Sequence, residues 1–598
     1  MIVRMAAPLA LSAIAAYGAG TLLPGRCFRS ASESVGFRIA AGMALYATLF
    51  FALAAAGRFR RPELLAAVAA GIAAAAWSVR EFSPHSFAPR PSARRSAPRP
   101  SARRSAPRLS AHLLAATALV AALGGAFLLA LYPPTAFDET LYHLPTVGAF
   151  AASGGMPFLA SLRTPVFPNA AEALEVPLYL LGGDVATHLV PLLATVATAI
   201  LVFASARPAG AAAAWLAAAI FLSSPIVVHL ASSGYVEATL TLFAFGAWAA
   251  VDRRGEGAPG PRRVLSAALA GASAAVKYLG LAVAAATTAA AALLSPRGRR
   301  VRAAVLSSAV AAAVLAPWYV RIVRATGNPV FPFAPGIFGH SAWDPVGLSH
   351  PGGIGRAVLD LLRLPWDTVF ARGRLNGQPP FSPWFLLVSP LLAWRAIRGR
   401  RARRVAAVCL GWGALWLFVP RDSRYLTLLL PILSVEAART IAAGGRALGR
   451  RVTPAVAALA VLPGIAYAGY RVAKQGPIPF GAAARERYLA EEVPAYHAVS
   501  FLNRTDPRGT VFVCGGEQLR WYYRGTMIGD VSGIARYDEL LALTDGAAVA
   551  RRLDALGVRY VLRVRGTCRA PVLDRGDFPF RSVYADDAAI VEERIATP

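Results

Sequence analysis

The sequence predicts an α-helical polytopic membrane protein with a small α/β domain at its C-terminal end. Of the 598 residues, 56% are hydrophobic and only 16% are charged, whereas about 25% are charged in a typical soluble domain. Long apolar runs recur up to residue 473, and from residue 474 the runs shorten and charges intersperse. These observations exclude an ordinary soluble enzyme.

The apolar runs predict about fourteen transmembrane helices, because a bilayer core needs about 20 mostly apolar residues for each crossing. The N-terminal run fits a secretory signal only loosely and is interpreted as the first membrane helix. Proline or glycine breaks several of the runs, which membrane helices tolerate. The expected spans are 2–22, 37–57, 62–80, 111–131, 184–206, 210–229, 237–251, 264–278, 279–295, 303–320, 381–397, 405–419, 425–443 and 454–473.

The basic residues indicate which loops face the cytoplasm. The chain has 62 Lys and Arg against 32 Asp and Glu, and loops retained in the cytoplasm carry the excess of basic residues. One exception is the cluster Arg58, Arg60 and Arg61, which this assignment places outside. The basic clusters are short and lie between apolar runs, so they form no continuous nucleic-acid-binding face. The segments assigned to the cytoplasm hold 25 arginines and lie within 81–110, 253–263, 297–302, 395–404 and 439–451.

Four domains follow from these patterns. Residues 1–80 form an N-terminal three-helix membrane extension, and 111–473 form the transmembrane core. Between them, 81–110 carries APRPSARRS twice in succession; such a Pro-, Ser- and Arg-rich segment buries no core and is predicted to be disordered. The last helix exports residues 474–598, in which TVFVC, VRYVLRV and FRSVYAD read as strands and AAVARRLDALG as a helix.

The four cysteines include no C-x-x-C pair, which excludes a zinc knuckle or a redox motif of that type. Cys514 and Cys568 each follow a predicted strand. If those strands are neighbours, the two residues can form a disulfide in an oxidising compartment. A disulfide and two free buried thiols both remain open.

The first outer loop of the core carries the main candidate site. It begins YPPTAFDETLYHLP, which contains Asp138, Glu139, Tyr142 and His143. At α-helical spacing, Glu139, Tyr142 and His143 share one face and Asp138 reaches Tyr142. Carboxylates near a membrane boundary are unfavourable unless a charged group uses them. The alternative is a helix start, where the helix dipole favours acids.

Further charged residues lie on the same predicted side of the membrane. Lys277 is one of only two lysines and lies inside an apolar stretch, so it needs a partner. Acids beside fixed cations suit a site that deprotonates a hydroxyl and holds a departing phosphate. For each arginine, a snorkelling or helix-end position is the alternative. The residues concerned, besides Lys277, are Glu237, Arg321, Arg324, Arg421, Asp422 and Arg424.

The ordered set of motifs over roughly 111–598 resembles the GT-C superfamily of membrane glycosyltransferases, on the branch of the protein O-mannosyltransferases and aminoarabinose transferases. The three N-terminal helices and the duplicated segment lie outside that pattern. The motifs are FDETLYHLP (137–145), FPNAAEALEVPLYLLGGD (167–184), GYVEATLTLF (234–243), AVKYLG (275–280), PWYVRIVRATGNPVFPF (317–333) and RDSRYLTLLLP (421–431).

The resemblance implies transfer of a sugar, with inversion, from a polyprenyl-phosphate donor to a lipid, glycan or protein acceptor at the outer face of the plasma membrane. It implies that Asp138 is the base or, with Glu139, helps to hold a divalent cation such as Mg²⁺ or Mn²⁺. Hydrogen bonding without a metal is the alternative. Glu139 and Glu237 would be supporting acids. The implied substrate-binding residues are Lys277, Arg321 and Arg424 as phosphate clamps, His143 as a donor to phosphate or sugar, and Tyr142, Glu172, Arg324 and Arg421.

Two other functions fit a polytopic chain. A transporter or flippase for lipid-linked saccharides predicts inverted repeats, and the two halves of this sequence show no paired pattern. A non-catalytic envelope scaffold would keep the fold without the chemistry, and the presence of Asp138 argues against it.

Overall fold

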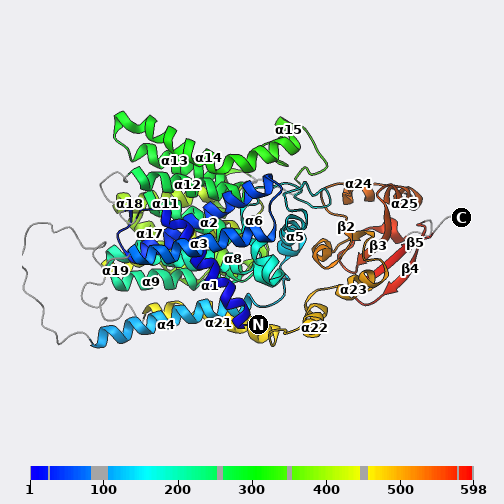
Figure 1. Cartoon of the computed structure of the whole chain (residues 1–598), viewed down its shortest axis with the longest axis horizontal. Helices are drawn as coiled ribbons and strands as arrows, with labels where there is room; N and C mark the ends of the chain where they lie inside the picture. Colours follow the sequence, from blue (N-terminus) through cyan, green and yellow to red (C-terminus); the bar gives the residue numbers. More distant parts are fainter. Residues whose placement is uncertain are drawn as a thin grey trace, which may run out of the picture.

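The protein is an elongated molecule with a helical bundle at one end and the C-terminal domain at the other (Figure 1). The computed structural model describes residues 2–24, 27–81, 106–251, 260–345, 353–444, 456–543, 545–574 and 578–595. Most of the predicted disordered linker, residues 82–105, lies outside the described residues.

The three predicted N-terminal helices are present as α1 (Ile2–Ala19), α2 (Ala31–Ala55) and α3 (Arg61–Glu81). Ser30 caps α2 by accepting a hydrogen bond from the backbone N–H of Glu33 at 3.2 Å. A Cβ atom on Gly42 would lie 1.8 Å from the Ala16 carbonyl oxygen. Helices α1 and α2 therefore approach as closely as they do because a glycine stands at their crossing.

Every predicted span corresponds to helical structure. Length and composition decide how many of these helices can cross a membrane. Seven helices in the described part of the chain are long and apolar enough to cross a membrane, or eight if α9 and α10, bent by 74°, form one span. The predicted count of about fourteen stays a prediction. The core helices are α4 (Ala106–Leu129), α8 (Leu189–Ala206), α9 (Ala211–Leu222), α10 (Pro225–Ala231), α11 (Glu237–Val251), α12 (Gly260–Val276), α13 (Leu279–Leu293), α14 (Arg300–Thr326), α17 (Pro383–Arg398), α18 (Arg400–Trp416), α19 (Leu430–Gly444) and α21 (Leu462–Gln475).

Two features of the bundle were not expected from the sequence. Helix α16 (Ile354–Phe370) is amphipathic, and Leu362 on it is 74% exposed. The segment Glu139–His143 (η5) is a π-helical turn, so the α-helical spacing predicted there is wrong. Single π turns are often found at functional sites. The rest of the first outer loop forms α5 (Leu144–Ser153), α6 (Ala170–Gly182) and α7 (Asp184–Thr187).

The C-terminal domain is α/β, as predicted. Its mixed five-stranded sheet has the order β2-β1-β3-β5-β4, in which β1 pairs in parallel with β2 and β3, and β5 pairs antiparallel with β3 and β4. Cys514 and Cys568 form a disulfide, which decides the open alternative. Strands β2 and β5 were not predicted. The elements are α22 (Ala482–Glu492), α23 (Tyr496–Thr505), β1 (Thr510–Cys514), β2 (Thr526–Ile528), α24 (Tyr537–Leu541), α25 (Gly546–Ala555), β3 (Val558–Val564), β4 (Phe580–Ala585) and β5 (Ala589–Arg594).

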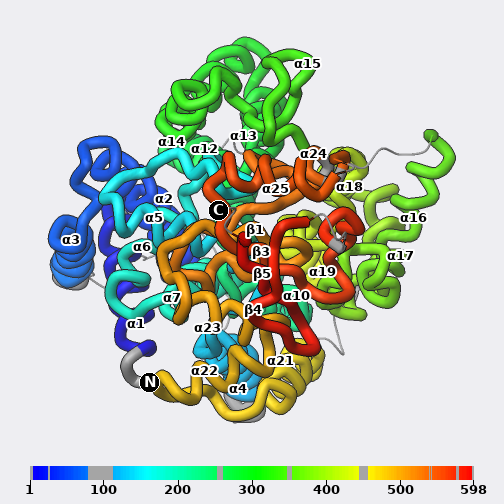
Figure 2. The backbone as a smooth tube through the Cα atoms, turned by 90° about the vertical axis from the view of Figure 1, so that its right-hand side faces the viewer, coloured from blue at the N-terminus to red at the C-terminus, as the bar shows by residue number. Residues whose placement is uncertain are grey.

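The C-terminal domain sits over the first outer loop (Figure 2). The short helix η10 (Glu517–Tyr522) packs against η5. The hydroxyl of Tyr522 donates to the Pro134 carbonyl at 2.6 Å, and Trp521 Nε1 donates to Asp184 at 3.1 Å. A second clasp joins Arg163 Nε to Asp530 Oδ1 at 2.9 Å. The domain thus braces the loop that carries the predicted acids.

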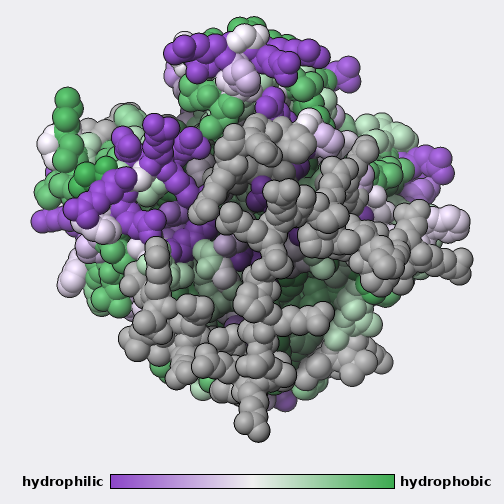
Figure 3. Space-filling view, turned by 90° about the vertical axis from the view of Figure 1, so that its left-hand side faces the viewer, coloured by the Kyte–Doolittle hydropathy of each residue, from purple (hydrophilic) through white to green (hydrophobic). Residues whose placement is uncertain are grey.

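The bundle has two chemically different ends. We call the end that carries the C-terminal domain the domain end, and the opposite end, where 297–302 and 395–404 lie, the Arg-rich end (Figure 1). Hydrophilic side chains gather at the top and left of the Arg-rich end (Figure 3). The exceptional cluster Arg58, Arg60 and Arg61 lies at the domain end, because the Phe59 N–H donates to the Gly154 carbonyl of the outer loop at 3.1 Å.

Candidate functional site

Asp138 and Arg424 form the centre of the site. Asp138 directly precedes η5, and Arg424 lies in η9 (Ser423–Leu429). Arg424 Nη1 donates to Asp138 Oδ2 at 2.8 Å, and Arg424 Nε donates to Asp422 Oδ2 at 2.9 Å. Asp422 also accepts the backbone N–H of Arg424, so it orients the guanidinium. Sequence reasoning placed Asp422 with the charged residues of RDSRYLTLLLP but gave it no role of its own.

Glu237 and Lys277 form the second charge pair of the site. Lys277 Nζ donates to Glu237 Oε1 at 2.7 Å, and Lys277 lies where α12 ends and α13 has not yet begun. Its ammonium group is 4.7 Å from the centroid of the Tyr425 ring, a cation–π distance. The Glu237 side chain is fully buried. The sequence prediction that Lys277 needs a partner is therefore confirmed.

The charges around Asp138 keep it ionised. Burial by itself would raise the pKa of Asp138, but Arg424, Lys277 and His143 outweigh the burial and lower that pKa to about 2. The Asp138 side chain keeps 15% of its surface exposed. At neutral pH the site therefore presents a reachable carboxylate between fixed cations.

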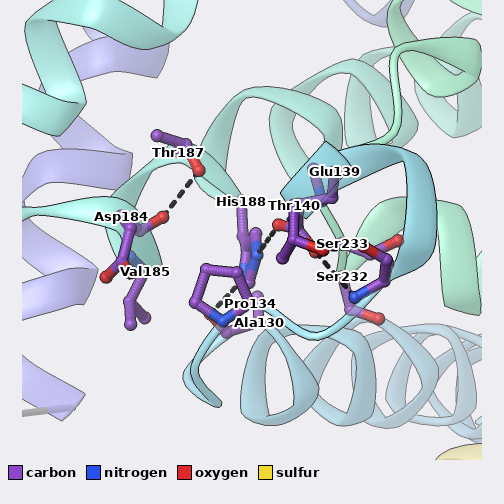
Figure 4. Close-up of polar contacts among 12 residues, drawn as sticks. Ala130, Pro134, Glu139, Thr140, Asp184, Val185, Thr187, His188, Ser232 and Ser233 are labelled. Carbon is purple, nitrogen blue, oxygen red and sulfur yellow. Dashed lines mark hydrogen bonds and ion pairs between the residues drawn. The ribbon is translucent and has the colours of Figure 1, made fainter. Parts of the chain in front are cut away.

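Glu139 points toward His188 (Figure 4). Its Oε1 accepts the Gly234 N–H at 2.8 Å and lies 2.5 Å from His188 Nε2. The other ring nitrogen of His188 donates to the Ala130 carbonyl at 3.0 Å, because that carbonyl can only accept. A Cβ atom on Gly234 would lie 2.5 Å from Glu139 Oε1. These contacts fix the Glu139 carboxylate and brace η5; sequence reasoning missed His188 and Gly234.

Two acids of α6, Glu172 and Glu175, are buried close to His143 and Glu139. His143 Nδ1 lies 2.8 Å from Glu172 Oε1, and both side chains are buried. Glu175, one turn further along, is buried with no hydrogen-bond partner among the described residues. Burial, together with the nearby Glu172 and Glu139, raises the pKa of Glu175 well above its usual range. This environment therefore favours the neutral form of Glu175, a residue that sequence reasoning did not single out.

Tyr142 lies at the centre, and three predicted cations do not. The Tyr142 ring is 4.3 Å from the His143 ring, and Asp138 acts electrostatically on its hydroxyl. Arg321 instead donates to the Met156 carbonyl at 3.1 Å and to other oxygens of 157–169, so it holds the first outer loop together. Arg324 is exposed, and Arg421 pairs with Asp360 of α16 at 2.8 Å.

A cavity of about 200 Å³ adjoins Glu139 and His188. Its remaining lining mixes apolar residues with polar ones, which include His229, Ser232 and Arg471. Arg471 comes from α21 and donates to the Tyr467 hydroxyl at 3.3 Å. The cavity thus offers a cation and hydrogen-bonding groups beside Glu139 and His188. Sequence reasoning missed Arg471 because it lies near the end of a predicted span.

The arrangement does not fit the predicted cation site. Asp138 is engaged by Arg424, whereas Glu139 is engaged by His188 and Gly234. Within the ranges that the structure describes, no group of three or more His, Cys, Asp or Glu side chains is placed to hold a metal ion. Metal dependence stays a prediction, and no step below is routed through a cation.

Comparison with solved structures identifies the fold. The structure is similar to ArnT from Cupriavidus metallidurans in the apo state, with a TM-score of 0.55 and 15% identity, covering 81% of this chain and 98% of that chain. The chain has the GT-C fold. ArnT is an aminoarabinose transferase with this fold, and the GT-C resemblance and the predicted fold class are thereby confirmed. The apolar helices and this likeness together make the chain a multi-pass membrane protein.

A second solved structure and one family model also match parts of the chain. The archaeal oligosaccharyltransferase AglB from Archaeoglobus fulgidus, solved with an inhibitory peptide and a dolichol-phosphate, matches with a TM-score of 0.45 and 14% identity, covering 76% of this chain and 69% of that one. A family model described as SF2091/S2213 matches residues 484–591, within the C-terminal domain. No curated protein sequence matches.

Proposed function

We propose that the protein is a membrane glycosyltransferase that moves a sugar from a polyprenyl-phosphate donor to a lipid, glycan or protein acceptor. The proposed reaction takes place at the domain end, which faces the extracytoplasmic side of the plasma membrane. The observation that carries the proposal is the reachable Asp138 carboxylate, held 2.8 Å from Arg424 and beside the Glu237–Lys277 pair. The GT-C fold supports it, because structural neighbours with this fold are glycosyltransferases.

The chemistry is a single displacement that inverts the anomeric carbon. The acceptor hydroxyl oxygen attacks that carbon, the bond from the carbon to the phosphate oxygen breaks, and its electron pair leaves with the lipid phosphate. Asp138 takes the hydroxyl proton. Arg424 and Lys277 stabilise the charge that develops on the departing phosphate.

Arg424 links binding of the donor phosphate to the basicity of Asp138. In the free protein Arg424, together with Lys277 and His143, lowers the pKa of Asp138 to about 2, which makes Asp138 a weak base. A donor phosphate that binds Arg424 competes with Asp138 for the same guanidinium. Asp138 then loses part of its counter-charge and becomes more basic when the donor is in place. Donor binding thereby activates the base.

The test uses the full-length protein in lipid with a panel of polyprenyl-phosphate sugars and an envelope extract that contains acceptors. We expect sugar transfer by the wild type and a loss of about a hundredfold or more in Asp138→Asn, the usual effect of removing a general base. Asp344→Asn is the matched control, because Asp344 pairs with His340 in a surface turn outside the site.

The outcomes separate the parts of the proposal. Transfer that survives Asp138→Asn keeps the enzyme and overturns the role of Asp138. Equal loss in Asp344→Asn points to a general effect on folding. No transfer from any donor overturns the proposal in favour of a flippase or a scaffold. Adding a chelator to the wild type tests the predicted divalent cation in the same assay.

A further inference from the structure

A cavity at the Arg-rich end is lined by arginines from separate parts of the fold. Its volume is about 220 Å³, and we call it the basic pocket. The segments that build it are far apart in the sequence, so only the tertiary fold brings their charges together. The arginines are Arg29, before α2; Arg207, in the short helix η6 (Arg207–Ala209); Arg262, in α12; Arg401, in α18; and Arg439, in α19.

The pocket carries more positive than negative charge. Glu33 accepts a hydrogen bond from Arg262 Nη2 at 2.7 Å, and Glu436 accepts one from Arg401 Nε at 2.9 Å. Five arginines thus line the pocket together with one carboxylate, Glu33, and the second carboxylate, Glu436, is a partner of Arg401. Several cations held close together in a partly enclosed space repel one another. An anion that enters the pocket relieves this repulsion.

The arginines differ in how firmly they are held. Arg262 is buried and donates to Glu33 and to the Cys27 carbonyl, so it forms part of the pocket wall. Arg29 and Arg207 have exposed side chains at the rim. The rim arginines are therefore the ones able to reorient onto an incoming anion.

The inner walls of the pocket are apolar. Phe245 and Val405 are buried there, and Trp248 is half-buried. A cationic rim above apolar walls matches a phosphate group that is attached to a hydrocarbon chain. Basic pockets between transmembrane helices at the cytoplasmic side bind such headgroups, and guanidinium groups bind phosphate through paired, charge-assisted hydrogen bonds.

We propose that the basic pocket binds a phosphate group, carried either by an anionic membrane lipid or by a soluble phosphate. The site lies at the end of the bundle opposite Asp138 and Arg424, and it does not depend on the proposed sugar transfer. It is a binding site in its own right, with Arg29 and Arg207 as the contacts that capture the anion.

The test measures thermal unfolding of the full-length protein in a zwitterionic detergent while phosphatidylglycerol or inorganic phosphate is added. A ligand that binds only the folded state raises the Tm in a saturable way. The variant Arg29→Gln/Arg207→Gln removes the two rim cations, and we expect it to need about tenfold more ligand for the same rise. Arg299→Gln/Arg300→Gln is the control, because these exposed arginines lie at the same end outside the pocket.

The outcomes distinguish the two sources of phosphate. A rise with phosphatidylglycerol that inorganic phosphate neither reproduces nor displaces supports a lipid headgroup. A rise with inorganic phosphate supports a soluble ligand. Equal weakening in the rim variant and the control, or no rise with either probe, overturns the proposal, since the first result reflects only general attraction to a basic surface.

Discussion

Charged side chains at the domain end and in the exposed loop 297–302 of the Arg-rich end are held in different ways. At the domain end, Asp138 pairs with Arg424 and Glu237 pairs with Lys277, and these partners come from different elements. At the Arg-rich end, Arg299 and Arg300 are exposed. The first group is placed by tertiary contacts, whereas the second follows from where a loop emerges from the bundle. The comparison teaches that charge which is dense in the sequence marks a site only where tertiary packing gathers it, as around Asp138 and in the basic pocket.

The largest expected effect comes from breaking a buried pair at the domain end. Lys277→Met leaves Glu237 buried without its partner, and removing one member of a buried ion pair destabilises a protein by about 3–5 kcal/mol. We expect a lower Tm and loss of transfer. The double variant Glu237→Gln/Lys277→Met should recover most of the Tm but not the transfer. Recovery of both would mean that the pair is only structural.

A second prediction concerns the pH dependence of transfer. Arg424→Gln removes a group that lowers the pKa of Asp138, and burial then raises this pKa from about 2 toward or above its ordinary value. The base is active only when ionised, so activity falls as the pH drops through that pKa. The acidic limb of kcat/KM should therefore lie at higher pH in Arg424→Gln than in the wild type. If the acidic limb did not move, Arg424 would not control the pKa of Asp138.

A third, smaller effect is expected where the C-terminal domain braces the domain end. Arg163→Ala removes the hydrogen bonds to Asp530, and a bond to a charged group contributes about 1.5–3 kcal/mol. Hydrogen exchange should become faster in η5 and in the segment around Asp530. Arg581→Ala, in which an exposed side chain is removed from β4, is the control. Equal exchange in both variants would mean that the clasp does not order the site.

The smallest effect is expected at the Arg-rich end. Arg299→Gln changes an exposed side chain, and such substitutions usually alter the free energy of unfolding by at most about 0.5 kcal/mol. The Tm should match that of the wild type within this limit. A loss as large as that of Lys277→Met would show that the exposed arginines are also held by tertiary contacts, and the contrast between the two ends would fail.

Sequence reasoning succeeded where a property depends on neighbouring residues. Strands 510–514 and 558–564 were predicted with the bounds that the structure has, because short Val-rich runs between turns favour β structure. Strand β2 was missed because it has only three residues. The need of Lys277 for a partner was predictable, since an isolated charge is unfavourable in an apolar stretch. The identity of that partner was not.

The sequence by itself determined the apolar helices, the separation of basic and acidic segments, and the fold class that the ArnT likeness confirms. These follow from hydrophobicity and local charge, which act through solvation of each segment. Only the tertiary structure decided that Arg424 meets Asp138 across 286 positions, and that Glu139 turns instead to His188. Arg321 and Arg421 likewise took structural partners. A charged side chain pairs with an opposite charge that the packing of distant helices brings within about 4 Å. The neighbouring residues in the sequence do not determine which charge that is.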